Sequence, residues 1–191
     1  MKKIGVLGLQ GAVQEHLDML GRIENVEPVI VKYKSDIEYI DGLIIPGGES
    51  TAIGRLLADF ELTGPLKDRI ENGMPVWGTC AGMIILAKKI TNDERRHLEV
   101  MDIEVVRNAY GRQLESFTAS VDLPGLSSDK IPLVFIRAPY VEDISPQVEI
   151  LLKLDERIVA CRQGHMLATS FHPELTADLS FHRYFAGMIK E

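Results

Sequence analysis

The sequence predicts an α/β protein with a mostly parallel central sheet, helices on both faces, and antiparallel hairpin strands added in the second half. Two observations lead to this fold class. Up to about residue 90, short apolar runs alternate with segments of helical spacing, and beyond that point apolar runs follow one another across turn-rich pieces. Strand–helix alternation is typical of parallel sheets, whereas tight turns join antiparallel strands.

The first half contains four expected strands, with helical segments between them. The first run, from Lys3 to Leu9, is apolar enough for a strand that is buried on both faces. Ala12–Ile23 repeats apolar residues at a helical interval. The remaining expected strands are Val29–Val31, Leu43–Ile45 and Val76–Thr79, and the remaining expected helices are Ser50–Leu57, Leu66–Ile70 and Met83–Ala87.

The second half lacks helical spacers between most of its apolar runs. The expected strands are Glu99–Val106, Ser116–Val121, Leu133–Arg137, Val148–Leu154, Arg157–Arg162 and Leu167–Phe171. An amphipathic helix over Leu179–Lys190 follows them. No repeat or linker divides the sequence, so we expect a single domain over residues 1–191.

The composition argues against several classes of function. The net charge is −7 and the sequence pI is near 5.3, so we expect no nucleic acid and no anionic membrane as partners. No apolar run approaches the roughly 20 residues of a membrane span. Polar residues from Gln10 onward interrupt the N-terminal run, which we interpret as a strand of a cytoplasmic protein and not as a secretion signal.

Two glycine-rich turns follow expected strands. G-V-L-G-L-Q-G (Gly5–Gly11) lacks the G-x-G-x-x-G spacing of a dinucleotide site, so a tight turn is favoured over a nucleotide cofactor. Gln10 in this turn can still face a ligand or partner. I-I-P-G-G-E-S-T (Ile44–Thr51) has no G-K-[ST] and is therefore not a nucleotide loop. It is either a plain turn or a place where backbone N–H groups face a cleft and hold an anion.

Cys80 stands in G-T-C-A-G (Gly78–Gly82), which has the form of a nucleophile elbow. In an elbow the reactive residue sits on a sharp strand-to-helix turn, so its neighbours two positions away must be small. The start of the following helix favours a thiolate, and the N–H of Ala81 can donate to an oxyanion. The alternative is a buried cysteine packed between glycines. With only two cysteines, no disulfide scaffold is expected, and Cys161 is expected to be a core residue.

A thiol nucleophile needs a base, and the base needs a group that orients it. Four of the five histidines are expected on the solvated surface: His16, His97, His165 and His182. His172 differs, because it ends the run A-T-S-F-H and is followed by Pro173 and Glu174. Residues two apart in extended backbone project to the same side, so Glu174 can accept a hydrogen bond from the imidazole. Cys80, His172 and Glu174 therefore form a coherent candidate triad.

The motifs P-G-G-E-S-T, G-T-C-A-G and F-H-P-E, in this order, resemble the triad-type (class I) glutamine amidotransferase domain over essentially the whole chain. Further motifs narrow the resemblance to glutaminase subunits of pyridoxal 5′-phosphate synthase. They are L-G-L-Q-G-A-V-Q-E-H, R-N-A-Y-G-R-Q, G-R-Q-L-E-S-F, F-I-R-A-P and C-R-Q-G-H-M-L-A-T-S-F-H-P-E-L-T. The resemblance implies the single-domain, three-layer fold of that family.

The resemblance also implies a reaction. Cys80 attacks the side-chain amide of L-glutamine, His172 takes the thiol proton and returns it to the departing ammonia, and Glu174 orients His172. Water then hydrolyses the γ-glutamyl thioester. The oxyanion hole is implied at Gly48 and Ala81, and the glutamine-binding positions are implied to be Gly48, Glu49, Ser50, Arg107, Ile136 and Arg137. An arginine suits a carboxylate because it can bind it bidentately.

By the same resemblance, ammonia passes internally to a separate pyridoxal 5′-phosphate synthase subunit, and the glutaminase is poorly active until it docks. Gln10 and the Gly11–His16 stretch are the expected contact surface. We expect no cofactor and no metal ion.

Three other interpretations remain open. A glutaminase subunit for another acceptor, such as imidazole glycerol phosphate or a nucleotide synthase, would share the triad but not G-R-Q-L-E-S-F and F-I-R-A-P. A free-standing elbow-cysteine peptidase or esterase would turn over without a partner and without preference for glutamine. A non-catalytic interaction module would keep a decayed site, although all three triad residues are present here.

Overall fold

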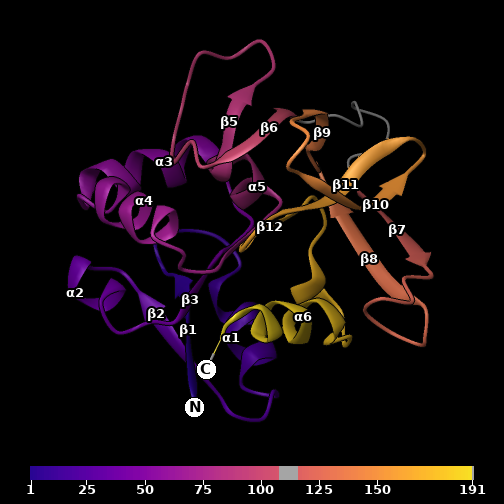
Figure 1. Ribbon diagram of the computed structural model, residues 1–191, viewed down its shortest axis with the longest axis horizontal. Helices are drawn as coiled ribbons and strands as arrows, with labels where there is room; N and C mark the ends of the chain where they lie inside the picture. The colour runs from indigo at the N-terminus through magenta and orange to yellow at the C-terminus, as the bar shows by residue number, and fades with distance from the viewer. Residues whose placement is uncertain (108–115, 191) are drawn as a thin grey trace.

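The computed structural model describes residues 1–107 and 116–190. Within these residues a ten-stranded sheet forms the centre of the molecule, and a separate two-stranded sheet lies to one side of it. Figure 1 shows the large sheet between two groups of helices, with the small sheet at the right of the view.

The half of the large sheet that carries the site is parallel. In spatial order its strands are β2 (Val26–Val31), β1 (Lys2–Leu7), β3 (Gly42–Ile45), β4 (Val76–Thr79) and β12 (Met166–Thr169). Every residue of β3, β4 and β12 is buried, as expected for strands covered on both faces. β12 comes from the second half of the chain, which returns to place it parallel to β4.

The other half of the sheet is mostly antiparallel. It continues through β11 (Arg157–Gln163), β9 (Tyr140–Ile144), β6 (Met101–Val106) and β5 (Ala87–Ile90), with β10 (Glu149–Leu154) paired to β11. β5 and β6 pair in parallel, whereas the other pairs in this half are antiparallel. Buried and half-buried residues alternate along β6, which is typical of a strand with one face in the core.

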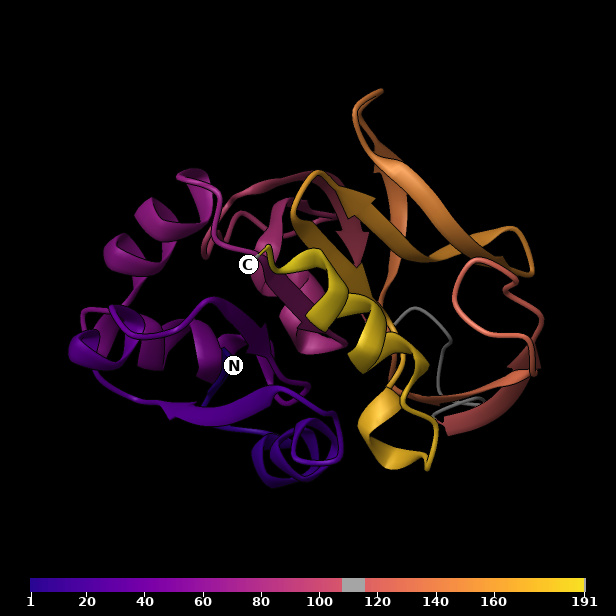
Figure 2. The same ribbon diagram turned by 60° about the horizontal axis from the view of Figure 1, so that its bottom comes forward.

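Two hydrophobic clusters fill the two faces of the sheet. One cluster contains buried residues of α2 (Lys34–Ile37), α3 (Ser50–Asp59), α4 (Thr63–Glu71) and α5 (Ala81–Leu86). The other contains residues of α1 (Val13–Leu20), α6 (Ser180–Met188) and the hairpin β7 (Ser116–Val121)–β8 (Ile131–Ile136). The fold therefore has three layers, as Figure 2 shows from a second side. In the described part of the chain, no helix is both long enough and apolar enough to cross a membrane.

The N and C marks stand close together in Figure 1. Lys2 Nζ donates a hydrogen bond of 2.9 Å to the carbonyl oxygen of Ala186 in α6. This contact joins the first strand to the last helix.

The expected fold class is confirmed, with corrections in the details. Every expected helix and strand is present within a few residues of its predicted ends, but α2, β5 and β9 were not expected. The expected helix Met83–Ala87 begins earlier, at Ala81, and stops at Leu86, because the backbone of Ala87 is extended and starts β5. The β7–β8 hairpin forms its own sheet and does not join the central one. It packs instead over the α6 face of the sheet, with Phe117 stacked on Phe135.

The turn from β4 into α5 brings Gly78 against Gly82. A Cβ atom added at Gly78 would stand 2.4 Å from the backbone carbonyl carbon and oxygen of Gly82. Backbone atoms cannot move aside as a flexible side chain can, so this turn requires glycine at position 78.

We predict that Gly78→Ala lowers the free energy of unfolding by roughly 3 kcal/mol, because it overpacks a rigid turn. Gly187→Ala is the matched control. Gly187 is an exposed residue of α6, and outside its neighbouring residues and its own helix backbone no atom lies within 4 Å of an added Cβ, so alanine there should stabilise the chain by up to about 1 kcal/mol. Urea unfolding of both variants checks the prediction, and equal stability of the two would contradict it.

Candidate active site

A cavity of about 570 Å³ opens at the carboxyl ends of the parallel strands. Its lining includes the residues that directly follow β3 and β4, together with His172, which follows β12. Ligands of open α/β sheets bind at this edge. The lining residues are Gly11, Ala12, Glu15, Gly47, Gly48, Glu49, Ser50, Cys80, Ala81, Ile84, Arg107, Ile136, Arg137, Pro139, His172 and Leu175. All the predicted site residues are among them except Glu174, which lies behind His172.

Cys80 occupies the turn between β4 and α5 in a strained conformation. Its φ of 50° and ψ of −104° lie in a region of backbone conformation that residues other than glycine rarely adopt, as in a nucleophile elbow. Its N–H donates to the carbonyl oxygen of Thr169 in β12 at 2.8 Å. Its thiol lies 3.8 Å from the carbonyl oxygen of Ile136 and is only 7% exposed. The strain and the position at the cavity favour the nucleophile over the packing cysteine.

His172 and Glu174 are hydrogen-bonded as predicted, but the backbone between them differs from the prediction. His172 Nδ1 lies 2.7 Å from Glu174 Oε1. Pro173 begins a short 3₁₀ helix, η1 (Pro173–Leu175), so Glu174 reaches back to the imidazole across a turn and not along an extended strand. The N–H of His172 donates to the carbonyl oxygen of Val134 in β8 at 2.7 Å, which fixes the imidazole-bearing residue from a second element.

The imidazole of His172 holds its proton strongly. Burial by itself would lower the pKa of His172, but hydrogen bonds with Cys80 and Glu174 outweigh burial and raise the pKa to about 10. The ring therefore holds a proton at neutral pH and stands between the sulfur of Cys80 and a buried carboxylate. A proton carrier in contact with both groups is what a cysteine nucleophile requires.

The loop after β3 is held by backbone contacts. Ala12 N–H donates to the carbonyl oxygen of Gly47 at 3.0 Å. The N–H of Gly48 belongs to the same planar trans peptide and therefore points in the opposite direction. Gln10, expected to face a ligand or partner, uses its Oε1 to accept from Glu49 N–H at 2.9 Å. The side chain of Gln10 thus fixes the loop that carries Gly48.

Glu49 lines the cavity, but its carboxylate caps a helix. It accepts from the N–H groups of Thr51 and Ala52 at 3.0 and 2.7 Å, at the start of α3. Partial desolvation opposes ionisation, but these two hydrogen bonds outweigh it and lower the pKa of Glu49. Ser50 is the first residue of α3 and is buried.

The two predicted arginines reach the cavity from different strands, and neither is fully buried. Arg137 directly follows β8, with a φ of 45°, and is exposed; it had been expected inside the strand. Arg107 follows β6 and is paired with Glu49 at 3.4 Å and with Asp93 at 3.2 Å. A guanidinium carries five N–H donors, so Arg107 keeps donors for a ligand.

Asp93 was not predicted to approach the site. It bridges Arg107 and Arg95, and the side chain of Arg95 donates to Asp93 and to Thr51. The charged segment N-D-E-R-R-H therefore lies beside the loop after β3. The sequence pattern could not predict this position, because the contact between Arg95 and Thr51 joins two loops that are far apart in the sequence.

Two of the four histidines expected on the surface are instead in the core. His16 of α1 and His182 of α6 are both 0% exposed, and their rings contact each other, with His16 Nδ1 3.0 Å from His182 Nε2. The prediction was wrong because the residues next to these histidines in the sequence, such as Glu15 and Arg183, are charged and exposed, while the histidines themselves lie on the buried face of each helix. His97 and His165 are partly exposed. Cys161 is buried, and burial raises the pKa of its thiol to about 12, which confirms it as a core residue.

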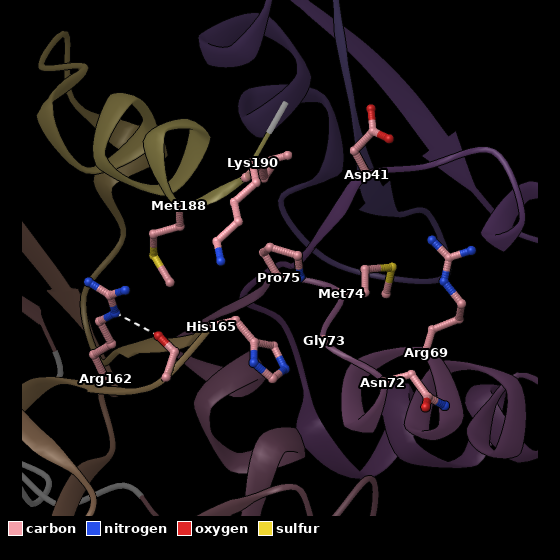
Figure 3. A pocket seen from close by; sticks show the side chains of 12 residues that line it. Asp41, Arg69, Asn72, Gly73, Met74, Pro75, Arg162, His165, Met188 and Lys190 are labelled. Atoms are coloured by element: carbon pink, nitrogen blue, oxygen red, sulfur yellow. Dashed lines mark hydrogen bonds between the residues drawn. The ribbon is translucent and has the colours of Figure 1, made fainter.

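A second cavity, of about 700 Å³, lies at the opposite edge of the sheet. Figure 3 shows Pro75 and His165, which precede β4 and β12, at its centre. Both of its arginines bind carbonyl oxygens, because Arg162 donates to Gly164 at 2.7 Å and Arg69 to Ile40 at 2.8 Å. The lining contains no cysteine, serine or threonine. The larger cavity therefore offers no thiol or hydroxyl nucleophile, whereas Cys80 lines the cavity at the other edge.

Most of R-N-A-Y-G-R-Q and G-R-Q-L-E-S-F falls in residues 108–115, which lie outside the described residues. Among residues 1–107 and 116–190, no group of three or more His, Cys, Asp or Glu side chains is arranged to hold a metal ion.

Comparison with known proteins identifies the family. The family model of the SNO glutamine amidotransferase family matches residues 6–191. A curated protein of Ruminiclostridium cellulolyticum, named pyridoxal 5′-phosphate synthase subunit PdxT, is 76% identical over 99% of this chain and 100% of its own length. A protein of Clostridium botulinum with the same name is 56% identical over 97% of this chain and 96% of its own.

A solved structure titled as that of a glutamine amidotransferase superposes with a TM-score of 0.91 at 43% identity. The superposition covers 97% of this chain and 98% of the other. The geometry at the carboxyl ends of the parallel strands agrees with these similarities. The chain belongs to the SNO glutamine amidotransferase family and is an enzyme of that kind.

Proposed function

We propose that this chain is the glutaminase subunit of a pyridoxal 5′-phosphate synthase, which hydrolyses L-glutamine to L-glutamate and supplies ammonia to the synthase subunit. The observation that carries the proposal is the convergence of Cys80 and the His172–Glu174 pair at one cavity. The names of the relatives from R. cellulolyticum and C. botulinum support the choice of pathway.

The reaction begins when His172 has taken the thiol proton of Cys80, so that the sulfur carries the electron pair of the broken S–H bond. The sulfur of Cys80 attacks the side-chain amide carbon of glutamine, and the C=O electron pair moves to the oxygen. Backbone N–H groups of Ala81 and Gly48 are the proposed donors to this oxyanion, because both residues line the cavity beside Cys80. Glu174 keeps the imidazole aimed at the sulfur through its bond to Nδ1.

Collapse of this intermediate breaks the C–N bond. His172 gives its proton to the departing nitrogen, which leaves as ammonia, and the acyl group stays on Cys80 as a thioester. A water molecule then attacks the thioester carbon while His172 accepts one of the water protons. The C–S bond breaks, glutamate is released, and the cysteine with its protonated histidine is restored.

Charge and position support the predicted glutamine-binding residues. The cavity wall carries Arg107 and Arg137, whose positive charge suits the α-carboxylate of an amino acid. Gly48, Glu49 and Ser50 also line the cavity, and the carbonyl oxygen of Ile136 lies 3.8 Å from the Cys80 sulfur. A cavity of about 570 Å³ is within the range that small ligands occupy.

The proposed contact surface for the synthase subunit is Gln10 and the Gly11–His16 stretch, with one residue removed. Gln10, Gly11 and Glu15 are exposed, and Gly11 and Glu15 line the cavity, which supports this stretch as the docking surface. His16 is buried and is excluded from it. We place the reaction in the cytoplasm, where a free thiol such as Cys80 stays reduced.

We expect Cys80→Ala to abolish glutamate release from L-glutamine, because no other group in the cavity can form the thioester. Glutamate is measured for the purified chain alone and with a pyridoxal 5′-phosphate synthase subunit added, where the wild type should gain strongly. Cys161→Ala is the control, since that thiol is buried away from the cavity, and it should keep its activity if it folds. Turnover by folded Cys80→Ala would exclude the mechanism, and turnover indifferent to the partner would point to another acceptor or a free-standing amidase.

His172→Asn should slow alkylation of Cys80 by iodoacetamide by about tenfold or more at pH 7, because the sulfur loses the group that takes its proton. Mass spectrometry after timed quenching gives the rate at each cysteine. Cys161, with its thiol pKa raised to about 12 by burial, should stay unmodified in both proteins. An unchanged rate at Cys80 would break the proposed pairing.

The proton on His172 should also make stability depend on pH. The pKa of His172 is about 10 in the folded chain, against 6.5 for an ordinary histidine, so the folded state holds an extra proton between these values. Its contribution is complete below pH 6.5 and is lost as the pH rises toward 10. Glu174→Gln removes the carboxylate that favours this proton, so urea unfolding should show a smaller loss between pH 6.5 and 9.5 than in the wild type. Parallel losses would contradict the assignment.

A further inference from the structure

The second oxygen of Glu174 has an unexplained environment. Oε1 is hydrogen-bonded to His172. Oε2 is buried and has no hydrogen-bond partner within the described residues. The side chain of Glu174 is 0% exposed. A buried carboxylate oxygen without a donor is costly. On this side the ring of His16 approaches the carboxylate, with its Nε2 3.4 Å from Oε2.

His16 is held in place by three elements of the fold. It comes from α1 and is completely buried. Its Nε2 lies 3.2 Å from the hydroxyl of Thr79, the last residue of β4, and its Nδ1 lies 3.0 Å from Nε2 of His182 in α6. Both histidine rings stand edge-on to Trp77. A continuous row of polar groups therefore runs from His182 through His16 and Glu174 to His172.

Burial keeps both inner histidines neutral. Desolvation lowers the pKa of His16 well below its ordinary value, and the neighbouring His182 and His172 lower it further. Burial lowers the pKa of His182 to about 3. Each ring therefore carries a single N–H, and in the contact between them one nitrogen must donate and the other must accept.

Only one assignment of these protons meets the charge of Glu174. If His16 donated from Nδ1, its Nε2 lone pair would face the carboxylate. The N–H of His182 would then stand on Nδ1, a buried atom with no partner in the described part of the chain. If His182 donates from Nε2, His16 carries its proton on Nε2. That N–H is within hydrogen-bond distance of the Thr79 hydroxyl, and the nitrogen that carries it lies 3.4 Å from Glu174 Oε2, so its positive end is on the side of the carboxylate.

We propose that His16 is a positioning residue of this enzyme: its Nε2–H holds the second oxygen of Glu174, and His182 fixes the tautomer that makes this possible. With both oxygens held, the carboxylate plane of Glu174 is set, and Oε1 is directed at His172 Nδ1. His16 touches neither the cavity nor the sulfur. It acts on the reaction only through Glu174 and His172.

The first test needs no variant. The ¹⁵N shifts of histidine-labelled wild-type protein distinguish protonated from unprotonated ring nitrogens. We expect the proton on Nε2 in both His16 and His182 at pH 7. A proton on Nδ1 of His16 would overturn the proposal. This result does not depend on the substrate, so it stands or falls apart from the proposed function.

The second test measures rates. His16→Leu removes the donor at similar volume, whereas His16→Gln keeps an N–H near the position of Nε2. With the synthase subunit present, His16→Leu should lower kcat for glutamine hydrolysis about 10- to 100-fold with KM within about twofold, because a misplaced catalytic group costs this much. His16→Gln should recover most of the loss. His165→Leu is the matched control, since His165 lies at the opposite edge of the sheet, and it should keep the wild-type kcat.

The readouts separate this proposal from the proposed function, on which only its kcat test rests. Cys80 alkylation should also slow in His16→Leu and recover in His16→Gln, with or without glutamine turnover. A folded His16→Leu chain with wild-type kcat and alkylation rate would overturn the positioning role. Equal loss in the leucine and glutamine variants would do the same. Absence of turnover in the wild type would instead refute the proposed function, while tautomers and alkylation still decide the role of His16.

Discussion

The parallel pairing of β4 with β12 is the contact on which the rest of the site depends. Thr79 pairs with Thr169 at the end of the register, and the next N–H along β4, that of Cys80, still donates to Thr169. Cys80, the proposed nucleophile, follows one of these strands, and His172, its proposed base, follows the other. Their separation is therefore set by a hydrogen-bonded ladder that is buried on both faces, which is a more rigid support than loops alone.

Burial of Glu174 is the second constraint, and it organises the core behind the cavity. A carboxylate that is removed from water must meet donors or cations on each side. One side meets the protonated ring of His172, and the other faces the neutral ring of His16. The pKa values of the three histidines are therefore shifted in opposite directions. The pKa of His172 is raised, which favours a charged ring, and those of His16 and His182 are lowered, which favours a neutral ring with one fixed proton.

The sequence was most informative where local chemistry decides structure. Runs such as Val76–Thr79 are apolar at every position because both faces of the strand are covered, so their pattern was sufficient. It failed at α2, β5 and β9. Each is five residues or fewer and includes charged, exposed residues, so it has neither a continuous apolar run nor the length to display a helical or strand period. β5 and β9 are stabilised by pairing with β6.

The sequence by itself determined the nucleophile elbow, the His172–Glu174 pair and the loop at Gly48, because each is a local motif whose residues lie within a few positions of one another. Only the tertiary structure decided that these motifs share one cavity, that Asp93 and Arg107 meet at its wall, and that His16 and His182 are buried behind Glu174. The physical reason is that burial and long-range pairing depend on which faces of distant elements meet. A helix such as α1 shows from its own residues that it has a buried face, but not that a carboxylate of the last quarter of the chain lies against it.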